Sequence, residues 1–316
     1  MKSVVYNKFG DAGVFELINS KIPEVSGNKV LVKTAFVSLN PVDWKVRKGE
    51  FKFLSGSTFP KGTGCDFSGV IVKADQGSEF KEGDEVFGCC NAFAANAMSE
   101  YIAIDKSLVH KVPTGLSLAK AASLPVVTAT ALLAFEDIAK VKAGDKVLIN
   151  GCTGGVGMIA VQLAKSKGAI VTGVCSGNSA PYATKWGVNR VIDYTKENIF
   201  QVAGEKYDVV LELSGKWTYP DALPLLADKS FFLNPTPGLN DVFIGGLRNF
   251  FSSQQVRPVF STPNDKATLK RIFNFVSAYP QLEVEISKSF PIEQFREAYE
   301  YAERGKFIGK IVVEFK

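Results

Sequence analysis

The 316-residue sequence has few of the residues that hold metal ions or cross-link small secreted domains. It contains a single histidine, His110, and an odd number of cysteines, none of them in C-x-x-C spacing. The cysteines are Cys65, Cys89, Cys90, Cys152 and Cys175. This pattern argues against a disulfide framework and against a zinc cluster, and it favours a reducing compartment. We therefore expect a cytoplasmic protein without a metal ion, in which His110 is structural or solvated.

Long apolar runs and concentrated charge are also missing. No stretch reaches about 18 apolar residues, so no segment is predicted to span a membrane, and the first residues do not resemble a signal peptide. The net charge is only +5, and the lysines and arginines are scattered. Nucleic acid is therefore a poor candidate partner, whereas an anionic small molecule or plain surface solvation accounts for the charge.

The pattern of the chain changes along its length, which predicts two domains. The first part, up to about residue 115, holds short β-branched runs separated by turn signals, as in a barrel or sandwich. An Ala- and Leu-rich helical stretch, 117–139, follows and is interrupted by Pro125. Strands then alternate with helices, which is typical of a doubly wound parallel sheet. An amphipathic helix at 291–302 and a strand at 310–315 are expected to return to the first domain.

The strongest local signal is a glycine turn between a predicted strand, 146–150, and a predicted helix, 155–167. Glycine tolerates positive φ, lets a diphosphate approach the backbone, and allows the helix to pack closely on the strand. The free N–H groups of a helix N-terminus also attract anions. A tight connection without a ligand is the alternative, but the second strand that follows, 170–174, favours a dinucleotide site. The predicted contacts in this turn are Gly151, Gly154, Gly155 and Val156.

The end of the second strand indicates the cofactor. A site for NAD places Asp or Glu there, where the carboxylate binds the ribose 2′-hydroxyl. Here Val174 is followed by Cys-Ser-Gly-Asn-Ser, which contains no carboxylate. Ser176, Asn178 and Ser179 can donate hydrogen bonds to a 2′-phosphate, although no Lys or Arg adjoins them. The sequence therefore favours NADPH over NADH.

Several motifs together resemble the quinone oxidoreductase-like, zinc-independent branch of the medium-chain dehydrogenase/reductases, which includes enone, alkenal and quinone oxidoreductases. The resemblance covers essentially the whole chain. The matching stretches are Leu39–Lys45, Gly64–Gly69, Ala122–Pro125, the glycine turn, Ile192–Asn198 and Gly309–Val313.

The resemblance implies an α/β fold of two domains. A GroES-like β-barrel domain is expected from residues 1–117 with 285–316, and a Rossmann domain with a doubly wound parallel sheet from residues 118–284. Zinc-dependent members carry ligands where Asn40 and Cys65 stand and near Val126, so only Cys65 could still bind a metal. A homodimer is a further expectation of this family.

The resemblance also implies which residues contact the cofactor. These are Asn40 and Lys45 near the nicotinamide, Thr128 and Gly154–Val156 at the diphosphate, Ser176 with Asn178 at the 2′-phosphate, Tyr194 against the adenosine, and Ser214 with Gly215 facing the cofactor. Asn178 departs from the family pattern, because relatives often place Lys or Arg there. Asn40, Lys45 and Tyr194 also have structural readings, as a turn residue, a solvated charge and a packed aromatic ring.

The implied reaction is hydride transfer from NADPH to a quinone or to the C=C bond of an α,β-unsaturated carbonyl. Asn40 and Lys45 are the candidate donors to the developing oxyanion. Aromatic residues are expected to line a pocket for this planar, conjugated substrate, together with the stretch 238–251, unless they form barrel core. They are Trp44, Phe51, Phe53, Phe59 and Phe93. An enoyl-thioester reductase and a non-enzymatic NADPH-binding partner protein are the alternatives.

Overall fold

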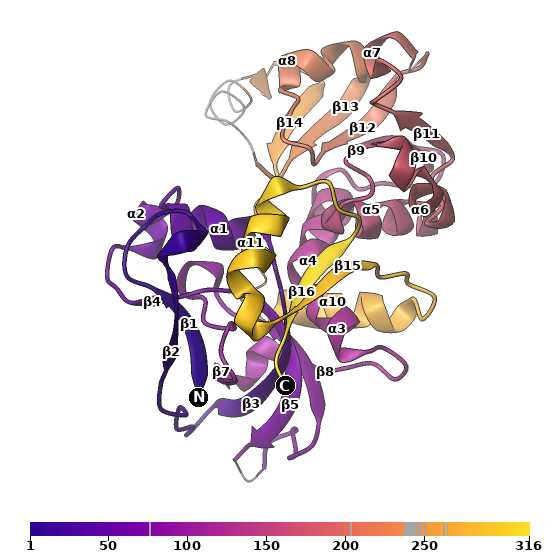
Figure 1. Ribbon diagram of the computed structural model, residues 1–316. Helices are drawn as coiled ribbons and strands as arrows, with labels where there is room; N and C mark the ends of the chain where they lie inside the picture. The colour runs from indigo at the N-terminus through magenta and orange to yellow at the C-terminus, as the bar shows by residue number, and fades with distance from the viewer. Residues whose placement is uncertain are drawn as a thin grey trace. The chain divides into compact units, whose positions relative to one another are not determined.

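The computed structural model describes residues 1–75, 77–202, 204–236, 245, 248–249, 251–261, 263 and 265–316. The chain divides into two compact units, which are described separately here (Figure 1). Unit 1 comprises Met1–Val126 with Thr262–Lys316, and unit 2 comprises Val127–Ser261. Among the described residues, no helix is long and apolar enough to cross a membrane.

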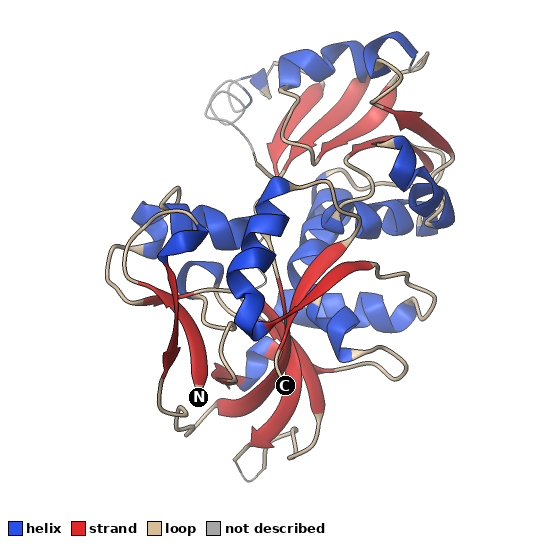
Figure 2. Ribbon diagram, viewed as in Figure 1, coloured by secondary structure: helices blue, strands red, loops and turns tan. Residues whose placement is uncertain are grey.

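Unit 1 is built on a seven-stranded sheet that contains strands from both ends of the chain (Figure 2). Its order is β15 (Ile286–Pro291), β16 (Lys310–Glu314), β3 (Lys29–Ser38), β5 (Asp66–Lys73), β6 (Glu85–Cys89) and β8 (Val109–Lys111), with β7 (Tyr101–Asp105) paired to β3. The last strand, β16, runs antiparallel to β3 and places Val313 opposite Val37. The predicted return of the C-terminal strand to the first domain is therefore confirmed.

A smaller sheet and five helices complete unit 1. The sheet has the order β2 (Phe15–Asn19), β1 (Lys2–Tyr6) and β4 (Lys61–Gly62). The helices are α1 (Pro41–Lys48), α2 (Lys52–Ser55), α3 (Leu118–Ala122), α10 (Lys266–Ala278) and α11 (Phe295–Arg304). The buried face of α11 consists of Phe295, Ala298, Tyr299 and Ala302, as its periodicity predicts.

The amphipathic helix α11 begins four residues later than the sequence pattern indicates. Pro291 ends β15, and a 3₁₀ turn, Ile292–Gln294, precedes the helix. Proline lacks an N–H but tolerates extended backbone at the end of a strand, which is the conformation that Pro291 adopts. The apolar periodicity therefore predicts the buried face of this helix correctly, but the predicted start of the helix, at Pro291, is wrong.

The borders of the two units differ from the expected domain borders, which placed residues 118–284 together in the Rossmann domain. Helix α3 packs on β3, β5 and β6, and α10 packs on β8, so residues 118–126 and 262–284 group with unit 1. Phe273 of α10 stacks on His110 with ring centroids 5.0 Å apart, which gives this histidine a structural role. Helical periodicity shows that one face is buried, but it does not identify the sheet that buries it.

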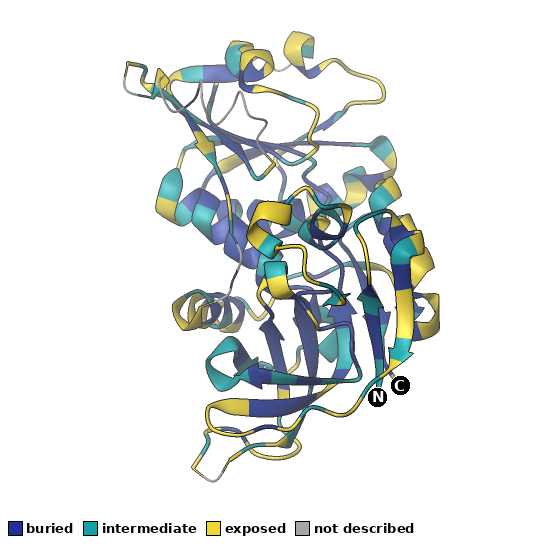
Figure 3. Cartoon of the chain, turned by 90° about the vertical axis from the view of Figure 1, so that its left-hand side faces the viewer, coloured by how far each residue is buried: buried dark blue, intermediate teal, exposed yellow. Residues whose placement is uncertain are grey.

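Unit 2 is a six-stranded parallel sheet with helices between the strands. The strand order is β11 (Arg190–Asp193), β10 (Ile170–Cys175), β9 (Lys146–Asn150), β12 (Tyr207–Glu212), β13 (Leu226–Asn234) and β14 (Gln254–Pro258). The described helices are α4 (Pro125–Leu132, continued by a π-helical turn), α5 (Gly155–Ser166), α6 (Ala180–Lys185), α7 (Ile199–Val202) and α8 (Tyr219–Ala222). The central strands are almost wholly buried, as Figure 3 shows. The predicted doubly wound parallel sheet is confirmed, and Pro125 begins a helix where the sequence suggested an interruption.

Candidate functional site

The connection from β9 to α5 is a tight turn that depends on glycine. Gly151 has a φ of 81°, a conformation that other residues rarely adopt. A Cβ atom on Gly157 would lie 2.4 Å from the carbonyl oxygen of Gly151. The first turn of α5 therefore packs directly on the strand–helix connection, which is the close contact that the glycine spacing predicts.

Gly154 in the same turn has a different surrounding. A Cβ atom at this position would meet only the Gly151 oxygen, at 3.5 Å, so the space beside Gly154 is open. Gly154 is the N-cap of α5, a helix of twelve residues, and it offers no side chain to cap the first N–H groups. An uncapped helix N-terminus with open space in front of it fits a diphosphate.

One predicted diphosphate contact has an unsatisfied polar atom. Thr128 lies on α4 and is fully buried, and its Oγ1 has no hydrogen-bond partner among the described residues. A buried hydroxyl without a partner costs free energy unless a ligand or water satisfies it. This orphaned atom is compatible with a ligand contact at Thr128.

Hydroxyl groups gather where β10 ends beside the glycine turn. Ser179 lies within hydrogen-bond distance of Ser176 (Oγ to Oγ, 3.0 Å) and of Thr153 (3.2 Å). Asn178 is exposed beside them. Tyr194 follows β11 and is half-exposed, and its backbone N–H donates to the carbonyl of Cys175. The residues predicted for the 2′-phosphate and the adenosine therefore lie at the carboxyl ends of neighbouring strands.

The structure brings a cation to this edge that sequence reasoning missed. The Nζ of Lys216 lies over the ring of Tyr194, 5.3 Å from its centroid. Lys216 follows β12, two strands away from β10 in the sheet, so sequence proximity gives no hint of this contact. The signal that could have found it is its position just after Ser214 and Gly215, which are themselves candidate cofactor contacts.

Ser214 is an exposed residue that belongs to a polar network at the end of β12, in which Glu212 and Asn150 are buried. Its Oγ donates to Glu212 Oε1 (2.7 Å), and the Asn150 amide donates to Glu212 Oε2 (2.6 Å) and to Ser214 Oγ (2.9 Å). Glu212 is fully buried and was not singled out from the sequence. This network joins the end of β12 to the end of β9, and it fixes the backbone on which Gly215 stands, with a φ of 70°.

Asn40 and Lys45, the two candidate catalytic residues, lie in unit 1 at the start of and within α1. The side-chain amide of Asn40 is buried and fully engaged. Its Nδ2 donates to Asp66 Oδ2 at 2.9 Å, with Ser38 O and Cys65 Sγ farther away, and its Oδ1 accepts from Lys310 Nζ at 2.6 Å. Both ends of the Asn40 amide are therefore bonded to buried side chains of unit 1, and a contact of Asn40 with a nicotinamide stays a prediction.

Lys45 contrasts with Asn40. It is half-buried, and its ammonium has no ion pair or hydrogen bond with any described residue. Asp43, which could have paired with it, instead accepts the backbone N–H of Asn40 at 2.8 Å. Lys45 is therefore a cation available to a ligand.

Two buried carboxyl groups lie close to Asn40. Burial raises the pKa of Asp43 to about 7, and burial likewise raises the pKa of Asp66 to about 6. Both oxygens of Asp66 lie near the backbone N–H of Val126, and Oδ2 is the closer at 3.1 Å. The Oδ1 of Asp43 has no hydrogen-bond partner at suitable geometry.

A cavity of about 280 Å³ lies within unit 1, and Asp43, Lys61, Thr63 and Asn96 are among the residues that line it. Of the aromatic residues expected in a pocket, Phe93 lines this cavity, and Phe51 packs edge-on against Phe93 at 5.8 Å. The others lie elsewhere. Trp44 and Phe59 pack on the barrel core, and Phe53 is 91% exposed. Most of the stretch 238–251 lies outside the described residues.

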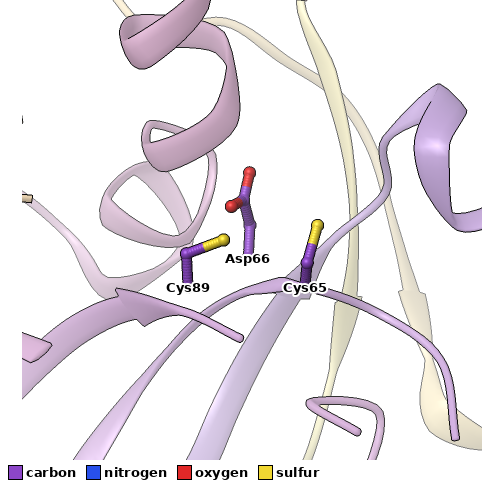
Figure 4. A group of neighbouring side chains, drawn as sticks. All are labelled: Cys65, Asp66 and Cys89. Atoms are coloured by element: carbon purple, nitrogen blue, oxygen red, sulfur yellow. The ribbon is translucent and has the colours of Figure 1, made fainter. Parts of the chain in front are cut away.

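Three potential metal ligands do come together in unit 1. The ligand atoms of Cys65, Asp66 and Cys89 lie within 4.8 Å of one another, and all three residues are buried (Figure 4). Their surroundings fit a metal ion poorly, however. The Asp66 carboxylate already accepts hydrogen bonds from Asn40 and Val126, and burial raises the pKa of the Cys89 thiol well above its usual value. The sequence reasoning missed this grouping because Cys89 lies on a different strand, β6.

A barrel unit formed from both chain ends and a Rossmann unit with an open glycine turn define the two-domain class of dehydrogenases and reductases. Residues 26–114 match the alcohol dehydrogenase GroES-like domain, and residues 186–313 match the family described as zinc-binding dehydrogenase. The chloroplast envelope quinone oxidoreductase homolog of Arabidopsis thaliana is 30% identical over 325 residues, which covers 99% of this chain and 98% of the relative. The chain therefore belongs to the quinone oxidoreductase-like family of the medium-chain dehydrogenase/reductases.

Two further proteins are similar over this chain. The NADPH-dependent alkenal/one oxidoreductase of Arabidopsis thaliana is 30% identical over 326 residues, covering 99% of this chain and 79% of that protein. The structure of the quinone oxidoreductase from Coxiella burnetii superposes with a TM-score of 0.87 at 28% identity, covering 100% of this chain and 99% of that one. The GroES-like and Rossmann fold expected from the sequence is thus confirmed.

Proposed function

We propose that this chain is an NADPH-dependent oxidoreductase that reduces quinones or the C=C bond of α,β-unsaturated carbonyls by hydride transfer, without zinc. The observation that carries the proposal is the open, uncapped glycine turn between β9 and α5 in a chain of this family. Relatives named as quinone and as alkenal/one oxidoreductases align with nearly the whole chain, which supports this substrate class. A small planar conjugated carbonyl or quinone is the proposed partner.

The proposed diphosphate site consists of Gly151, Gly154, Gly155, Val156 and Thr128. The backbone N–H groups at the start of α5 face the open space beside Gly154 and can donate to phosphate oxygens. Thr128 offers a hydroxyl that has no other described partner. Ser214 and Gly215 are proposed to face the cofactor from the end of β12, where Glu212 and Asn150 hold them.

The proposed site for the 2′-phosphate consists of Ser176, Asn178 and Lys216. Ser176 and Asn178 supply hydrogen-bond donors at the end of β10, and Lys216 supplies the positive charge that is missing at position 178. Tyr194, which lies under the Lys216 ammonium, is proposed to contact the adenosine. This arrangement supports a preference for NADPH, because a lysine favours a phosphate dianion over a hydroxyl group.

In unit 1, Lys45 is proposed to stabilise negative charge on the substrate oxygen. Lys45 is half-buried, and its ammonium is unpaired within the described part of the chain, so it can approach an oxyanion without first breaking a salt bridge there. NADPH, when bound, supplies the hydride. Asn40 is proposed to contribute at the nicotinamide end, and its buried hydrogen bonds fix the start of α1 on which Lys45 stands.

Three finer points belong to the same proposal. The poor fit of Cys65, Asp66 and Cys89 to a metal ion supports a zinc-independent reaction. All five cysteines are free and buried, which supports a reducing compartment, and we take the cytoplasm as the simplest one. The relatives named above include chloroplast proteins, so localisation needs its own measurement. A homodimer is proposed from the family alone.

The test follows the absorbance of the reduced nicotinamide while quinones, enones, enoyl thioesters and alcohols are offered with NADPH or NADH. We expect NADPH oxidation with quinones or enones that chelators do not inhibit. Gly154→Ala should lose this activity, whereas Gly13→Ala, a glycine whose added Cβ meets nothing within 4 Å, should keep it.

Other outcomes would assign the chain differently. Selective turnover of enoyl thioesters would identify an enoyl-thioester reductase. Binding of NADPH without oxidation by any electrophile would identify a non-enzymatic NADPH-binding partner protein. Alcohol-dependent reduction of NAD that is abolished by chelators would contradict the zinc-free proposal.

A further inference from the structure

Lys310 is a lysine in an unusual place. It is the first residue of β16, only 3% of its surface is exposed, and its Nζ lies in the interior of unit 1. The ammonium donates to the backbone oxygen of Leu39 at 2.8 Å and to Asn40 Oδ1 at 2.6 Å. Both acceptors belong to the turn that leads from β3 into α1.

The neighbours of this ammonium are the potential metal ligands of unit 1. Burial lowers the pKa of Lys310, and the negative charges of Asp66 and Asp43 oppose this shift. The thiols of Cys65 and Cys89 lie beside Asp66. Figure 4 shows Cys65, Asp66 and Cys89 near one another, where β5 begins and β6 ends. Asn40 connects the Lys310 ammonium to this cluster, because its Oδ1 accepts from Lys310 while its Nδ2 donates to Asp66.

Stability alone is a poor explanation for this arrangement. A buried charge is expensive to desolvate, and the hydrogen-bond partners of this ammonium among the described residues are two neutral oxygens, of Leu39 and Asn40. The strand that carries Lys310 is otherwise apolar at Ile311, Val312 and Val313, which are all buried. A methionine or leucine at position 310 would continue this pattern at a lower desolvation cost.

We propose that Lys310 is a positioning residue whose ammonium orients Asn40 and, by its positive charge, keeps divalent metal ions out of the Cys65–Asp66–Cys89 cluster. The positive charge that a metal would bring to these ligands is supplied by the chain itself. The amide of Asn40 is thereby held in one orientation, with its oxygen toward Lys310 and its nitrogen toward Asp66. The role in orienting Asn40 rests on the proposed function, whereas the exclusion of metal ions does not.

The test compares Co²⁺ binding by the full-length wild-type chain and three variants. Lys310→Gln removes the charge but keeps an amide donor for Asn40. Lys310→Arg keeps the charge. The double variant Lys310→Gln with Cys89→Ser removes one candidate ligand. The readouts are the thiolate-to-cobalt charge-transfer absorption and the bound metal per chain after gel filtration.

We expect Lys310→Gln to bind Co²⁺ at least about 100-fold more tightly than the wild type, because a repulsive unit charge that acts on Asp66 is removed. The charge-transfer absorption should appear in Lys310→Gln and be lost in the double variant, while Lys310→Arg should resemble the wild type. Such a spectrum reports the ligands directly, and a general loss of stability would not produce it.

Three results would overturn the proposal. The first is a wild-type chain that binds one equivalent of Co²⁺ through its thiols. The second is a folded Lys310→Gln variant that binds no more Co²⁺ than the wild type. The third is failure of Lys310→Gln to fold together with failure of a fourth variant, Lys310→Met, made as a folding control, since Lys310 would then be a stability residue.

The NADPH oxidation assay tests the orientation of Asn40 separately. Lys310→Gln should lower kcat by about 10- to 100-fold with little change in the KM for NADPH, and Lys310→Arg should restore part of the loss. An unchanged kcat would refute the orienting role. If none of the electrophiles supports NADPH oxidation by the wild type, the proposed function fails. The Co²⁺ titration still decides whether Lys310 excludes metal ions.

Discussion

Gly154 and Gly157 allow the packing role and the binding role of the glycine turn to be separated. An alanine at 157 would place its Cβ 2.4 Å from the Gly151 oxygen and 2.6 Å from the Cys152 carbonyl carbon. Both atoms are backbone, so neither can move aside as a flexible side chain would. An alanine at 154 would have its nearest neighbour at 3.5 Å and would project into the open space before α5.

The two substitutions should therefore fail in different ways. Gly157→Ala overpacks a tight contact, and we expect it to destabilise the chain by about 1–3 kcal/mol. At about 2–4 °C per kcal/mol, the Tm should fall by several degrees. Gly154→Ala should keep its Tm within about 2 °C of the wild type, since its cost is limited to a weaker N-cap. It should nevertheless weaken NADPH binding at least about 10-fold, because the methyl group occupies the space proposed for the diphosphate.

Thermal unfolding without ligand and fluorescence titration with NADPH measure the two effects independently. Gly13→Ala is the matched control, because its added Cβ meets nothing within 4 Å and it lies in the other unit. Wild-type affinity for NADPH in a folded Gly154→Ala variant would refute the reasoning that this open space holds the diphosphate. A wild-type Tm for Gly157→Ala would show that α5 can shift away from the turn at little cost.

Four further predictions concern charged groups. Burial raises the pKa of Asp43 to about 7, so its contribution to stability is present below about pH 4 and is lost as the pH rises through 7. Asp43→Asn should remove this pH-dependent loss of a few kcal/mol in the free energy of unfolding, measured in urea at several pH values. An unchanged dependence of that free energy on pH would contradict the prediction. Asp221, an exposed aspartate that likewise accepts its N-cap N–H, has a pKa lowered by hydrogen bonds from Thr218, so Asp221→Asn should lose stability chiefly at neutral pH and little at low pH. Arg47→Met should lower the free energy of unfolding by about 1–3 kcal/mol, because it leaves the Gly10 carbonyl without its donor and leaves Glu303 with Lys48 but without Arg47; a Tm equal to that of the wild type would rule this out. Lys216→Gln should raise the Kd for NADPH about 10-fold and leave the Kd for NADH unchanged, and equal losses for both would remove Lys216 from the 2′-phosphate site.

The parts of the fold that depend on short-range patterns could be predicted from the sequence. Strand β9 spans the five residues expected, and α5 begins at Gly155 as the glycine spacing indicates. Alternation and helical periodicity are local signals, so they identify elements well. They identify element ends less well, as the late start of α11 after Pro291 illustrates.

The interactions that surround the candidate site could not be predicted in the same way. Lys310 and Asn40 are 270 residues apart in the chain, and their contact depends on the register of β16 against β3. Lys216 reaches Tyr194 only because the loop after β12 crosses the carboxyl edge of the sheet. Such contacts result from tertiary packing, and a single sequence contains no periodicity that would reveal them. The shape of the glycine turn has a local sequence signal, whereas the contacts that hold Asn40 in place have none.

The pairing of β16 with β3 has a consequence for synthesis on the ribosome. Translation proceeds from the N-terminus, so β3 emerges long before residues 310–314 exist. Strand β7 pairs with Lys29–Lys33 of β3, but the edge at Phe36–Ser38 has no partner until β16 has been made. Unit 2 is contiguous in sequence and can fold as it leaves the exit tunnel. During that interval the unpaired edge of β3 can associate with other chains. Nascent chains of this protein should therefore depend on chaperones more than their size alone would suggest.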